Sequence, residues 1–374
     1  MHPEVLDAMR PWQETLFANP SGSHRAARAA RKAVDEAREV IAAELGVQAG
    51  DVVFTGGGTE SDNYAISGSV RARGGTAVCS AVEHHAVLDP VEHHAGRTVA
   101  VTADARIDVD DLRCVLDSMT SAGQEVAVVS VMAVNNEVGS CNDIAEVASV
   151  VRAHAPNAWL HTDAVQAACW VDLSELTPHV DLLSLSAHKF GGPKGVGIMV
   201  VSNGVAPEPL MRGGGQERGR RSGTIDVAGA VGTATALHIT GSQRATASQR
   251  VTSLRDELLD ALTAIDGVTE TVPRLRTVPG IAHICVNVLD SDALLFMLDE
   301  ADVYASAASA CASGAMESSH VLSALGLSDD LRRGALRLSL GHTTSSADID
   351  RAISIITNSI GQLRERKAAR KQRA

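Results

Sequence analysis

The sequence predicts a two-domain α/β protein whose larger domain is built on a mostly parallel central sheet. The chain has 374 residues, which is enough for about two domains. Short apolar, β-branched runs alternate with amphipathic helical segments, and this alternation is typical of a parallel sheet covered by helices. The hydrophobic fraction of 45% is ordinary but only 2% of the residues are aromatic, so a planar ligand would find few rings to stack on.

The larger domain is expected over residues 15–245. Its first long helix covers residues 23–45, where apolar side chains recur at steps of three and four and Gly46 supplies a stop signal. The apolar runs with the length and branching of buried strands are 51–56, 76–80, 126–132, 159–163, 181–186 and 196–201. The helical segments that separate the first four runs lie near 60–72, 85–94, 108–119 and 143–154.

The smaller domain is expected to be α+β and to comprise residues 246–374, with residues 1–14 packed beside it. Its expected elements are helix 246–265, strand 281–288, helix 291–300, strands 303–306 and 335–340, and helix 346–366. The chain then ends in a basic tail from about residue 364, which is interpreted as a solvated helix end.

Composition excludes several classes of protein. The net charge of −12 disfavours direct binding to nucleic acid, and the six cysteines form no CxxC pair, so neither a disulfide scaffold nor a zinc site is supported. No apolar run approaches the roughly 18 residues that span a bilayer, and the N-terminus lacks the pattern of a signal peptide. We therefore expect a cytoplasmic protein with neither a membrane segment nor a resident metal.

A glycine-rich turn follows the first strand. GGGTESDN (56–63) places Gly58 and Thr59 between a strand and a helix, where backbone N–H groups and the helix N-terminus can face an anion such as phosphate. The turn is neither a Walker A loop nor a GxGxxG motif. A tight turn with a Thr N-cap is the alternative reading.

Polar residues also end two later strands, and ligands bind at such ends in open α/β sheets. Asp163, the last residue of WLHTD, could keep a heterocyclic nitrogen protonated, and Gln166 could hydrogen-bond a neighbouring ring substituent. The alternative is that Asp163 only caps the N-terminus of a helix. Ser186, His188 and Lys189 end the strand at 181–186 before a Gly/Pro turn, and a lysine held there is suited to a Schiff base with an aldehyde cofactor.

Two further residues become candidate site residues when they are considered together with the motifs above. His84 lies at the mouth of the second strand, where an imidazole could lie against a planar ring; a lone histidine is otherwise a satisfied surface or core group. Cys311 lies among Ser, Ala and Gly in SAASACASGA, a segment that could let a nucleophilic thiol move between an interior and the surface. The alternative is an inert thiol in a small-residue turn, and the other five cysteines are interpreted as structural.

Taken together and in this order, these residues resemble those of the class V aminotransferase group of fold-type I pyridoxal-phosphate enzymes, and with Cys311 the chain is similar to the cysteine desulfurases. The likeness covers nearly the whole chain. The motifs that carry it are GGGTESDN (56–63), EHHAV (83–87), NNEVG (135–139), HTDAVQ (161–166), SAHKFGGPKGVG (186–197), GGGQERGRRSGT (213–224), SACAS (309–313) and RLSLG (337–341).

The resemblance implies a role for each matching residue. Lys189 would bind the cofactor aldehyde, Asp163 would pair with the pyridinium nitrogen, Gln166 would meet the phenolic oxygen and His84 would stack on the ring. The implied phosphate ligands are Gly58, Thr59, Ser186 and His188, with Thr224 from the partner subunit of a homodimer. Asn136 and Arg337 would hold the substrate carboxylate, to which the planar fork of arginine is well matched.

The implied reaction converts L-cysteine to L-alanine. Cys311 would take the sulfur as a persulfide, with His84 as a candidate proton relay, and pass it to an acceptor protein such as an iron–sulfur scaffold or a thiolation enzyme. Cys311 could touch an iron–sulfur cluster only transiently. The other readings are a selenocysteine lyase, another class V enzyme, or a catalytically silent assembly scaffold. The resemblance also implies a short strand and an Ala-Ala-Thr-Thr-Pro stretch ahead of MHPEVLDAM, where this sequence starts.

Overall fold

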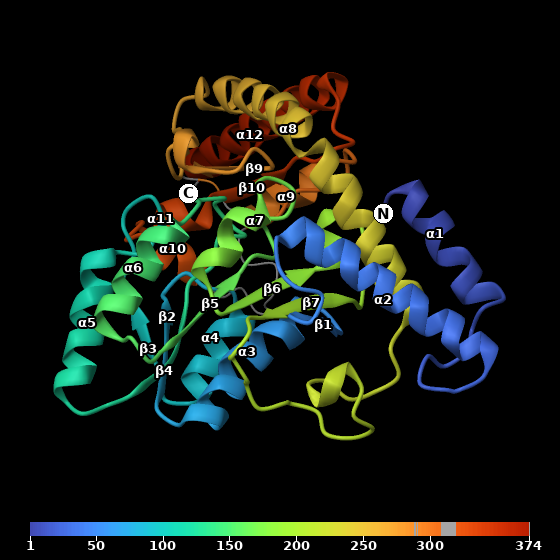
Figure 1. Ribbon diagram of the computed structural model, residues 1–374. Helices are drawn as coiled ribbons and strands as arrows, with labels where there is room; N and C mark the ends of the chain where they lie inside the picture. The colour runs from blue at the N-terminus through green and yellow to red at the C-terminus, as the bar shows by residue number, and fades with distance from the viewer. Residues whose placement is uncertain (288, 290, 308–318, 374) are drawn as a thin grey trace. The chain divides into compact units, whose positions relative to one another are not determined.

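The computed structural model describes residues 1–287, 289, 291–307 and 319–373 (Figure 1). The chain forms two compact units. Unit 1 comprises residues 1–100, 107–134 and 142–244, and unit 2 comprises residues 101–106, 135–141 and 245–374.

Unit 1 contains a seven-stranded sheet in the order β1-β7-β6-β5-β4-β2-β3. The strands are β1 (Val52–Thr55), β2 (Thr76–Ser80), β3 (Arg97–Val99), β4 (Val126–Ser130), β5 (Trp159–Asp163), β6 (Leu182–Ser186) and β7 (Gly197–Val201). Pairing is parallel from β6 across to β3, whereas β7 is antiparallel to both β6 and β1. The sheet is therefore mostly parallel, as predicted, and β1 runs in the same direction as β2, β4, β5 and β6.

Most helices of unit 1 connect these strands. They are α1 (Pro3–Glu14), α2 (Arg25–Leu45), α3 (Gly58–Arg73), α4 (His85–His93), α5 (Val109–Ser121), α6 (Ile144–His154) and α7 (Leu173–Leu176), with the short 3-10 turns η1 (Thr177–His179), η2 (Ala187–Phe190) and η3 (Glu217–Gly219). Helix α2 ends as predicted, because Gly46 adopts the left-handed conformation at φ 65°. Asp108 and Asp143 accept backbone N–H bonds at the starts of α5 and α6.

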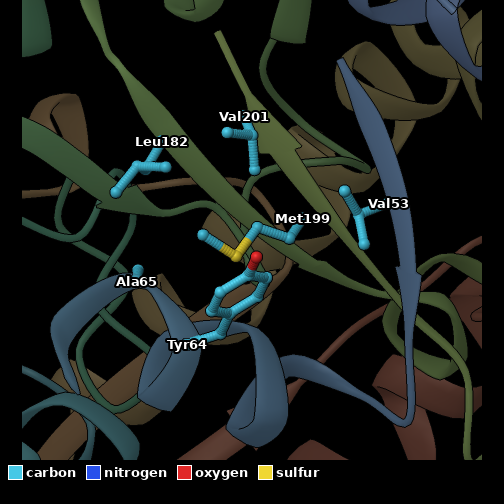
Figure 2. Packing of buried hydrophobic residues seen from close by; sticks show 6 residues of the cluster. All are labelled: Val53, Tyr64, Ala65, Leu182, Met199 and Val201. Atoms are coloured by element: carbon cyan, nitrogen blue, oxygen red, sulfur yellow. The ribbon is translucent and has the colours of Figure 1, made fainter. Parts of the chain in front are cut away.

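The core between α3 and the sheet is mostly aliphatic, with Tyr64 buried in it and the half-buried Trp159 packed against it. Tyr64 of α3 lies against Met199 of β7 among fully or nearly fully buried side chains (Figure 2). The cluster consists of Val53, Tyr64, Ala65, Leu182, Met199 and Val201. Burying this face of α3 fixes the helix on the sheet, and with it the position of the helix N-terminus at the carboxyl end of β1.

The N-terminal residues belong to unit 1, whereas the sequence analysis grouped residues 1–14 with the smaller domain. His2 donates its backbone N–H to the carbonyl oxygen of Gly191 over 3.0 Å. On α1, Val5 and Met9 are buried, and a Cβ added at Gly232 would come within 2.6 Å of the Met9 sulfur. The apolar face of α1 is thus covered by residues of the larger unit.

The long helix α8 (Val227–Thr263) contributes residues to both units, and the expected start of this helix at 246 was wrong. Its first half, VAGAVGTATALHIT, is rich in Gly and Thr, which have low helix propensity. Packing overrides that preference, since Gly229 and Gly232 allow other side chains to approach the helix closely.

Unit 2 contains a three-stranded antiparallel sheet in the order β10-β9-β8. Its elements besides α8 are β8 (Val268–Glu270), η4 (Arg274–Arg276), β9 (Ile281–Val286), α9 (Ser291–Asp299), α10 (His320–Ala324), α11 (Asp329–Arg333), β10 (Ala335–Ser339) and α12 (Ser346–Arg373). The expected strand 303–306 is reduced to an isolated bridge between Ser306 and Arg337. Among the helices of the described residues, none is long and apolar enough to cross a membrane.

Candidate active site

The predicted cofactor residues of unit 1 gather where strands end. Gly58 and Thr59 follow β1, His84 follows β2, Asp163 closes β5 and Ser186 closes β6. Because these strands run in one direction, their carboxyl ends lie along the same edge of the sheet. Sheet topology therefore brings together residues that lie far apart in the sequence.

The turn between β1 and α3 is shaped to lie close to the neighbouring strand ends. Gly58 is buried at the start of α3, and a Cβ there would approach the Val165 Cγ2 to 2.8 Å and the Ser186 Cβ to 3.5 Å. Gly57 adopts φ 147°, which a side chain would disfavour. The first turn of α3, with its unpaired backbone N–H groups and positive dipole end, is thus placed beside Ser186, in the arrangement that suits a phosphate.

Thr59 and His84 line one cavity of about 400 Å³. Its other lining residues are Asn63, Ser67, His85, Ala86, Asp89, Pro90 and His93. The His84 Nδ1 accepts the Ala86 N–H over 3.0 Å, which caps α4 and fixes the plane of the imidazole. An imidazole held in this way, half-buried at the mouth of β2, could pack against a planar ring.

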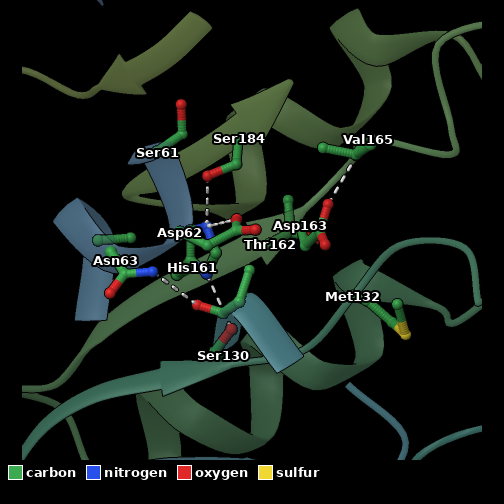
Figure 3. A network of polar contacts seen from close by, with 12 residues as sticks. Ser61, Asp62, Asn63, Ser130, Met132, His161, Thr162, Asp163, Val165 and Ser184 are labelled. Carbon is green, nitrogen blue, oxygen red and sulfur yellow. Dashed lines mark hydrogen bonds and ion pairs between the residues drawn. The ribbon is translucent and has the colours of Figure 1, made fainter. Parts of the chain in front are cut away.

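Asp163 is a buried acid that lies at the end of β5. Its side chain is 5% exposed and accepts the Val165 N–H over 2.8 Å (Figure 3). Burial raises the pKa of Asp163 to about 6, while the backbone hydrogen bond and the positive charge of Lys189 act in the opposite direction. A carboxylate in such surroundings is stabilised by a cation, and a protonated heterocyclic nitrogen is one such partner.

Behind Asp163 lies a polar network that the sequence analysis missed. The His161 ring bonds Ser130 over 2.8 Å and Ser184 over 3.0 Å, and its Nε2 lies 3.6 Å from an Asp62 oxygen (Figure 3). Burial lowers the pKa of His161 to about 3 and raises that of Asp62, to which the charge of Asp163 contributes further. Polar residues inside the apolar runs WLHTD and LLSLS were the signal available in the sequence.

Glu83, adjacent to His84, is a third buried acid. One carboxylate oxygen accepts the Met132 N–H over 2.7 Å, which joins the turn after β2 to the end of β4. Burial raises the pKa of Glu83 well above its ordinary value, and the charge of Asp163 adds to this effect. The position of His84 thus depends on a neighbour that the sequence analysis did not single out.

Lys189 lies on η2, directly after β6, and its side chain is exposed at the sheet edge. Gly191 ends this turn in the left-handed conformation at φ 80°. The Oγ of Ser186 and the Nδ1 of His188 are 2.9 Å apart, and burial together with the nearby lysine charges lowers the pKa of His188. This short turn therefore presents a hydroxyl, an imidazole and an amine at the carboxyl end of β6, the strand that pairs with the strand of Asp163.

The segment 213–224 is held by a buried ion pair. Glu217 accepts two hydrogen bonds from the Arg38 guanidinium, at 2.7 and 2.9 Å, and a third from the Phe54 N–H at 2.9 Å. Its backbone has the strained φ of 49°. Both side chains are almost fully buried, so this pair anchors the segment to α2, and the bond from Phe54 anchors it to β1.

A second pair joins the same segment to the start of α3. Arg221 donates to both oxygens of Glu60, over 2.9 and 3.2 Å, and Glu60 accepts the Gly56 N–H over 2.7 Å. Thr224, three residues further on, is exposed and lines a separate cavity of about 520 Å³. Thr224 is thus held on an anchored segment but does not line the Thr59–His84 cavity.

The expected substrate residues lie in unit 2. The Nη1 of Arg337 donates to the backbone oxygen of Asn136 over 2.9 Å, so this expected pair is in contact. Cys311 lies outside the described residues. Of the other cysteines, Cys114 is exposed on α5 and so does not pack in the core, while burial raises the pKa of Cys141 and of Cys169 to about 11.

The fold and the site together define a class. A mostly parallel seven-stranded sheet carries a phosphate-type glycine turn after β1, a buried acid after β5 and a lysine after β6. That combination is the large domain of a fold-type I pyridoxal-phosphate-dependent transferase.

Comparisons with known proteins narrow the class. The chain belongs to the class V aminotransferase family, whose model matches residues 1–352. It is 41% identical to an IscS-like cysteine desulfurase of Mycobacterium tuberculosis, over 97% of this chain and 94% of that protein. Among solved structures, a NifS-like protein matches with a TM-score of 0.87 at 29% identity, over 97% of this chain and 96% of the other. The structure titled SspA in complex with cysteine matches with a TM-score of 0.78 at 29% identity, over 91% and 96% of the two chains. By its relatives, the chain is a cysteine desulfurase of this family.

Proposed function

We propose that this protein uses pyridoxal 5′-phosphate to convert L-cysteine to L-alanine and to transfer the released sulfur to its own Cys311. The observation that carries the proposal is the placement of Lys189 and of the buried Asp163 at the carboxyl ends of adjacent parallel strands. The charge of Lys189 already acts on Asp163, so the two groups lie within electrostatic reach.

The residues present fit the cofactor. The first turn of α3, which Gly58 allows to lie close to Ser186, suits a phosphate, with Thr59 and His188 as further ligands. Asp163 would hold the pyridine nitrogen in its protonated form, Gln166 would hydrogen-bond the phenolic oxygen and His84 would lie on the ring face. When bound, pyridoxal phosphate supplies an electron sink for the electrons released at the substrate α-carbon.

The chain's own groups then move the proton and the sulfur. Arg337 and Asn136 would hold the substrate carboxylate, and the Lys189 Nζ would accept the α-proton. The Cys311 thiolate would attack the substrate sulfur, so that the C–S bond of L-cysteine breaks and an S–S bond forms on the enzyme. Alanine leaves, and the persulfide retains the sulfur.

The proposal also includes two protein partners, a second subunit of the same chain and a protein that accepts the sulfur. Thr224 would complete the phosphate site of a second subunit, which makes the protein a homodimer. A protein of the cytoplasm that accepts persulfide sulfur, for iron–sulfur cluster assembly or for thiolation, would complete the reaction.

Mass spectrometry of the intact protein after incubation with L-cysteine tests the proposal. We expect one added sulfur atom on Cys311 together with alanine in solution. Cys311→Ala should lose the added sulfur and keep the cofactor's absorption, whereas the matched control Cys114→Ala, at an exposed cysteine, should behave as the unmodified chain. Lys189→Ala should lose the covalently held cofactor. Sulfur release unaffected by Cys311→Ala would rule out the assigned thiol.

A further inference from the structure

The turn that carries Lys189 is too short to pair all of its own carbonyl groups. It is the single 3-10 turn η2, and the backbone N–H groups of Gly191 and Gly192 both bond the carbonyl oxygen of Ala187. The last carbonyl groups of any helix lack a partner within the helix. The carbonyl oxygens of Lys189, Phe190 and Gly191 therefore require donors from elsewhere in the chain.

Three distant segments supply one donor each to these three carbonyl groups. The Cys169 thiol donates to the Lys189 oxygen over 3.4 Å. The Thr240 hydroxyl donates to the Phe190 oxygen over 3.0 Å. The N-cap residue of α1 donates its backbone N–H to the Gly191 oxygen over 3.0 Å. The backbone around Lys189 is thus joined to segments that lie far from it in the sequence.

The Thr240 hydroxyl bonds outside its own helix. Threonine hydroxyls inside a helix often bond the carbonyl oxygen four residues earlier, as those of Thr233 and Thr235 do on α8. Thr240 lies on the same helix but donates to Phe190. Both Thr240 and Phe190 are buried, so water has little access to this bond.

The Cys169 thiol remains a donor at ordinary pH. Burial raises its pKa to about 11, so the S–H proton is retained. A thiol is a weaker donor than a hydroxyl. Thr240 therefore makes the stronger of the two side-chain bonds to the turn.

We propose that Thr240 and Cys169 are positioning residues for Lys189, which they hold through the carbonyl groups of Phe190 and of Lys189 itself. The Lys189 side chain is exposed whereas that of Phe190 is buried, so bonds to the backbone fix the point from which the lysine extends. Such precision matters, since a misplacement of about 1 Å can reduce a catalytic rate about 100-fold. The inference rests on the proposed function, in which Lys189 binds the cofactor and accepts the α-proton.

Two substitutions of Thr240 and one control test the role. Thr240→Val keeps the shape of the side chain and removes the donor, whereas Thr240→Ser keeps the donor. Thr233→Val is the matched control, because it removes a buried hydroxyl of α8 that bonds its own helix.

The first readout is the rate at which the holoenzyme loses pyridoxal phosphate on dilution, followed by the absorption of the cofactor. A displaced Lys189 amine recaptures the cofactor less often, so Thr240→Val should lose it about tenfold faster. The second readout is steady-state kinetics with L-cysteine. Thr240→Val should lower kcat about tenfold and change KM less than about twofold, because the residues for the substrate carboxylate are unaltered.

Thr240→Ser and Thr233→Val should stay within about twofold of the unmodified enzyme in both readouts. Equal changes in Thr240→Val and Thr233→Val would overturn the proposal, since they would reflect a general weakening of α8. Unchanged cofactor loss and kcat in Thr240→Val would overturn it as well.

If Thr240→Val fails to fold, Cys169→Ala takes its place. This change removes the weaker donor and should speed cofactor loss about threefold. An unchanged rate of cofactor loss would again overturn the proposal.

Borohydride reduction followed by peptide mass spectrometry separates this inference from the proposed function. If the cofactor is found on Lys189 but no alanine forms from L-cysteine, the proposed reaction fails. Cofactor loss that depends on Thr240 would still support the positioning role. If no cofactor is found on Lys189, the positioning role is overturned together with the proposed function.

Discussion

Asp163 is an acid that folding places where water cannot stabilise its charge. Its neighbours Asp62 and Glu83 are also buried, and the charge of Asp163 makes ionisation of both harder. A cation bound beside Asp163 would stabilise its carboxylate. It would therefore lower the free energy of ionising this acid. The raised pKa of Asp163 therefore results from the fold itself and does not require a bound cofactor.

The burial of Asp163 predicts a pH dependence for the cofactor-free protein. The folded pKa of about 6 lies above the ordinary value of 3.8, so between these values the folded state binds more protons than the unfolded state. The free energy of unfolding should therefore fall as the pH rises from about 4 to 6, by roughly 3 kcal/mol from this group.

Asp163→Asn should lack that contribution. Urea denaturation of both cofactor-free proteins between pH 4 and 6.5 measures it, and the difference between the two curves gives the contribution of Asp163 together with its effect on Asp62 and Glu83. Parallel curves would show that Asp163 does not titrate in this window.

At the scale of elements, the site depends on how closely the turn after β1 approaches β5 and β6. Gly58 allows this approach, because its missing Cβ leaves room for the Val165 methyl group beside Asp163. The segment 213–224 is tied to the same region through the pair of Arg221 and Glu60. The turn after β1, the ends of β5 and β6, and the segment 213–224 are thus linked in space although they lie far apart in the sequence.

Gly58→Ala should disturb both packing and cofactor binding. The new Cβ would meet the Val165 Cγ2 at 2.8 Å, and relieving this overlap should destabilise the protein by about 1–3 kcal/mol. It should also weaken cofactor binding about tenfold, since the turn must move. Urea denaturation and cofactor titration measure the two effects.

Gly361→Ala on α12 is the matched control. Nothing lies within 4 Å of a Cβ at this position, so the change should stabilise the protein by about 0.5–1 kcal/mol through helix propensity and leave cofactor affinity unchanged. Equal loss of affinity in both variants would show that the approach at Gly58 is not what matters.

At the scale of the whole molecule, the proposed homodimer makes Thr224 act on the partner's cofactor. A mixed dimer of Lys189→Ala and Thr224→Val subunits would then contain one doubly impaired site and one intact site. Activity should reappear on mixing two weakly active variants, to about one half of the unmodified enzyme. If Thr224 served its own subunit, both sites would be impaired and mixing would restore nothing. Co-expression with two affinity tags and an assay of alanine production measure the result.

The sequence predicted six of the seven strands of the central sheet, all but β3, and most of its helices, because their signals are local. The apolar β-branched runs and the helical period predicted for residues 23–45 depend only on neighbouring residues, and both appear in the structure, the helix over residues 25–45. The prediction was less successful where tertiary packing determined the secondary structure or the placement of a helix. The first half of α8 has weak helix formers, residues 303–306 form only a bridge, and α1 packs on unit 1.

For the site, the sequence by itself determined which residue types follow which strands, and the motif order carried the assignment to the family. Only the tertiary structure decided what supports them. The network of Asp62, His161 and Glu83, the anchors at Glu217 and Glu60, and the bonds from Cys169 and Thr240 to the turn of Lys189 all join residues distant in the chain. No local pattern encodes such contacts, because they arise from strand order, register and burial, which the folded chain sets as a whole.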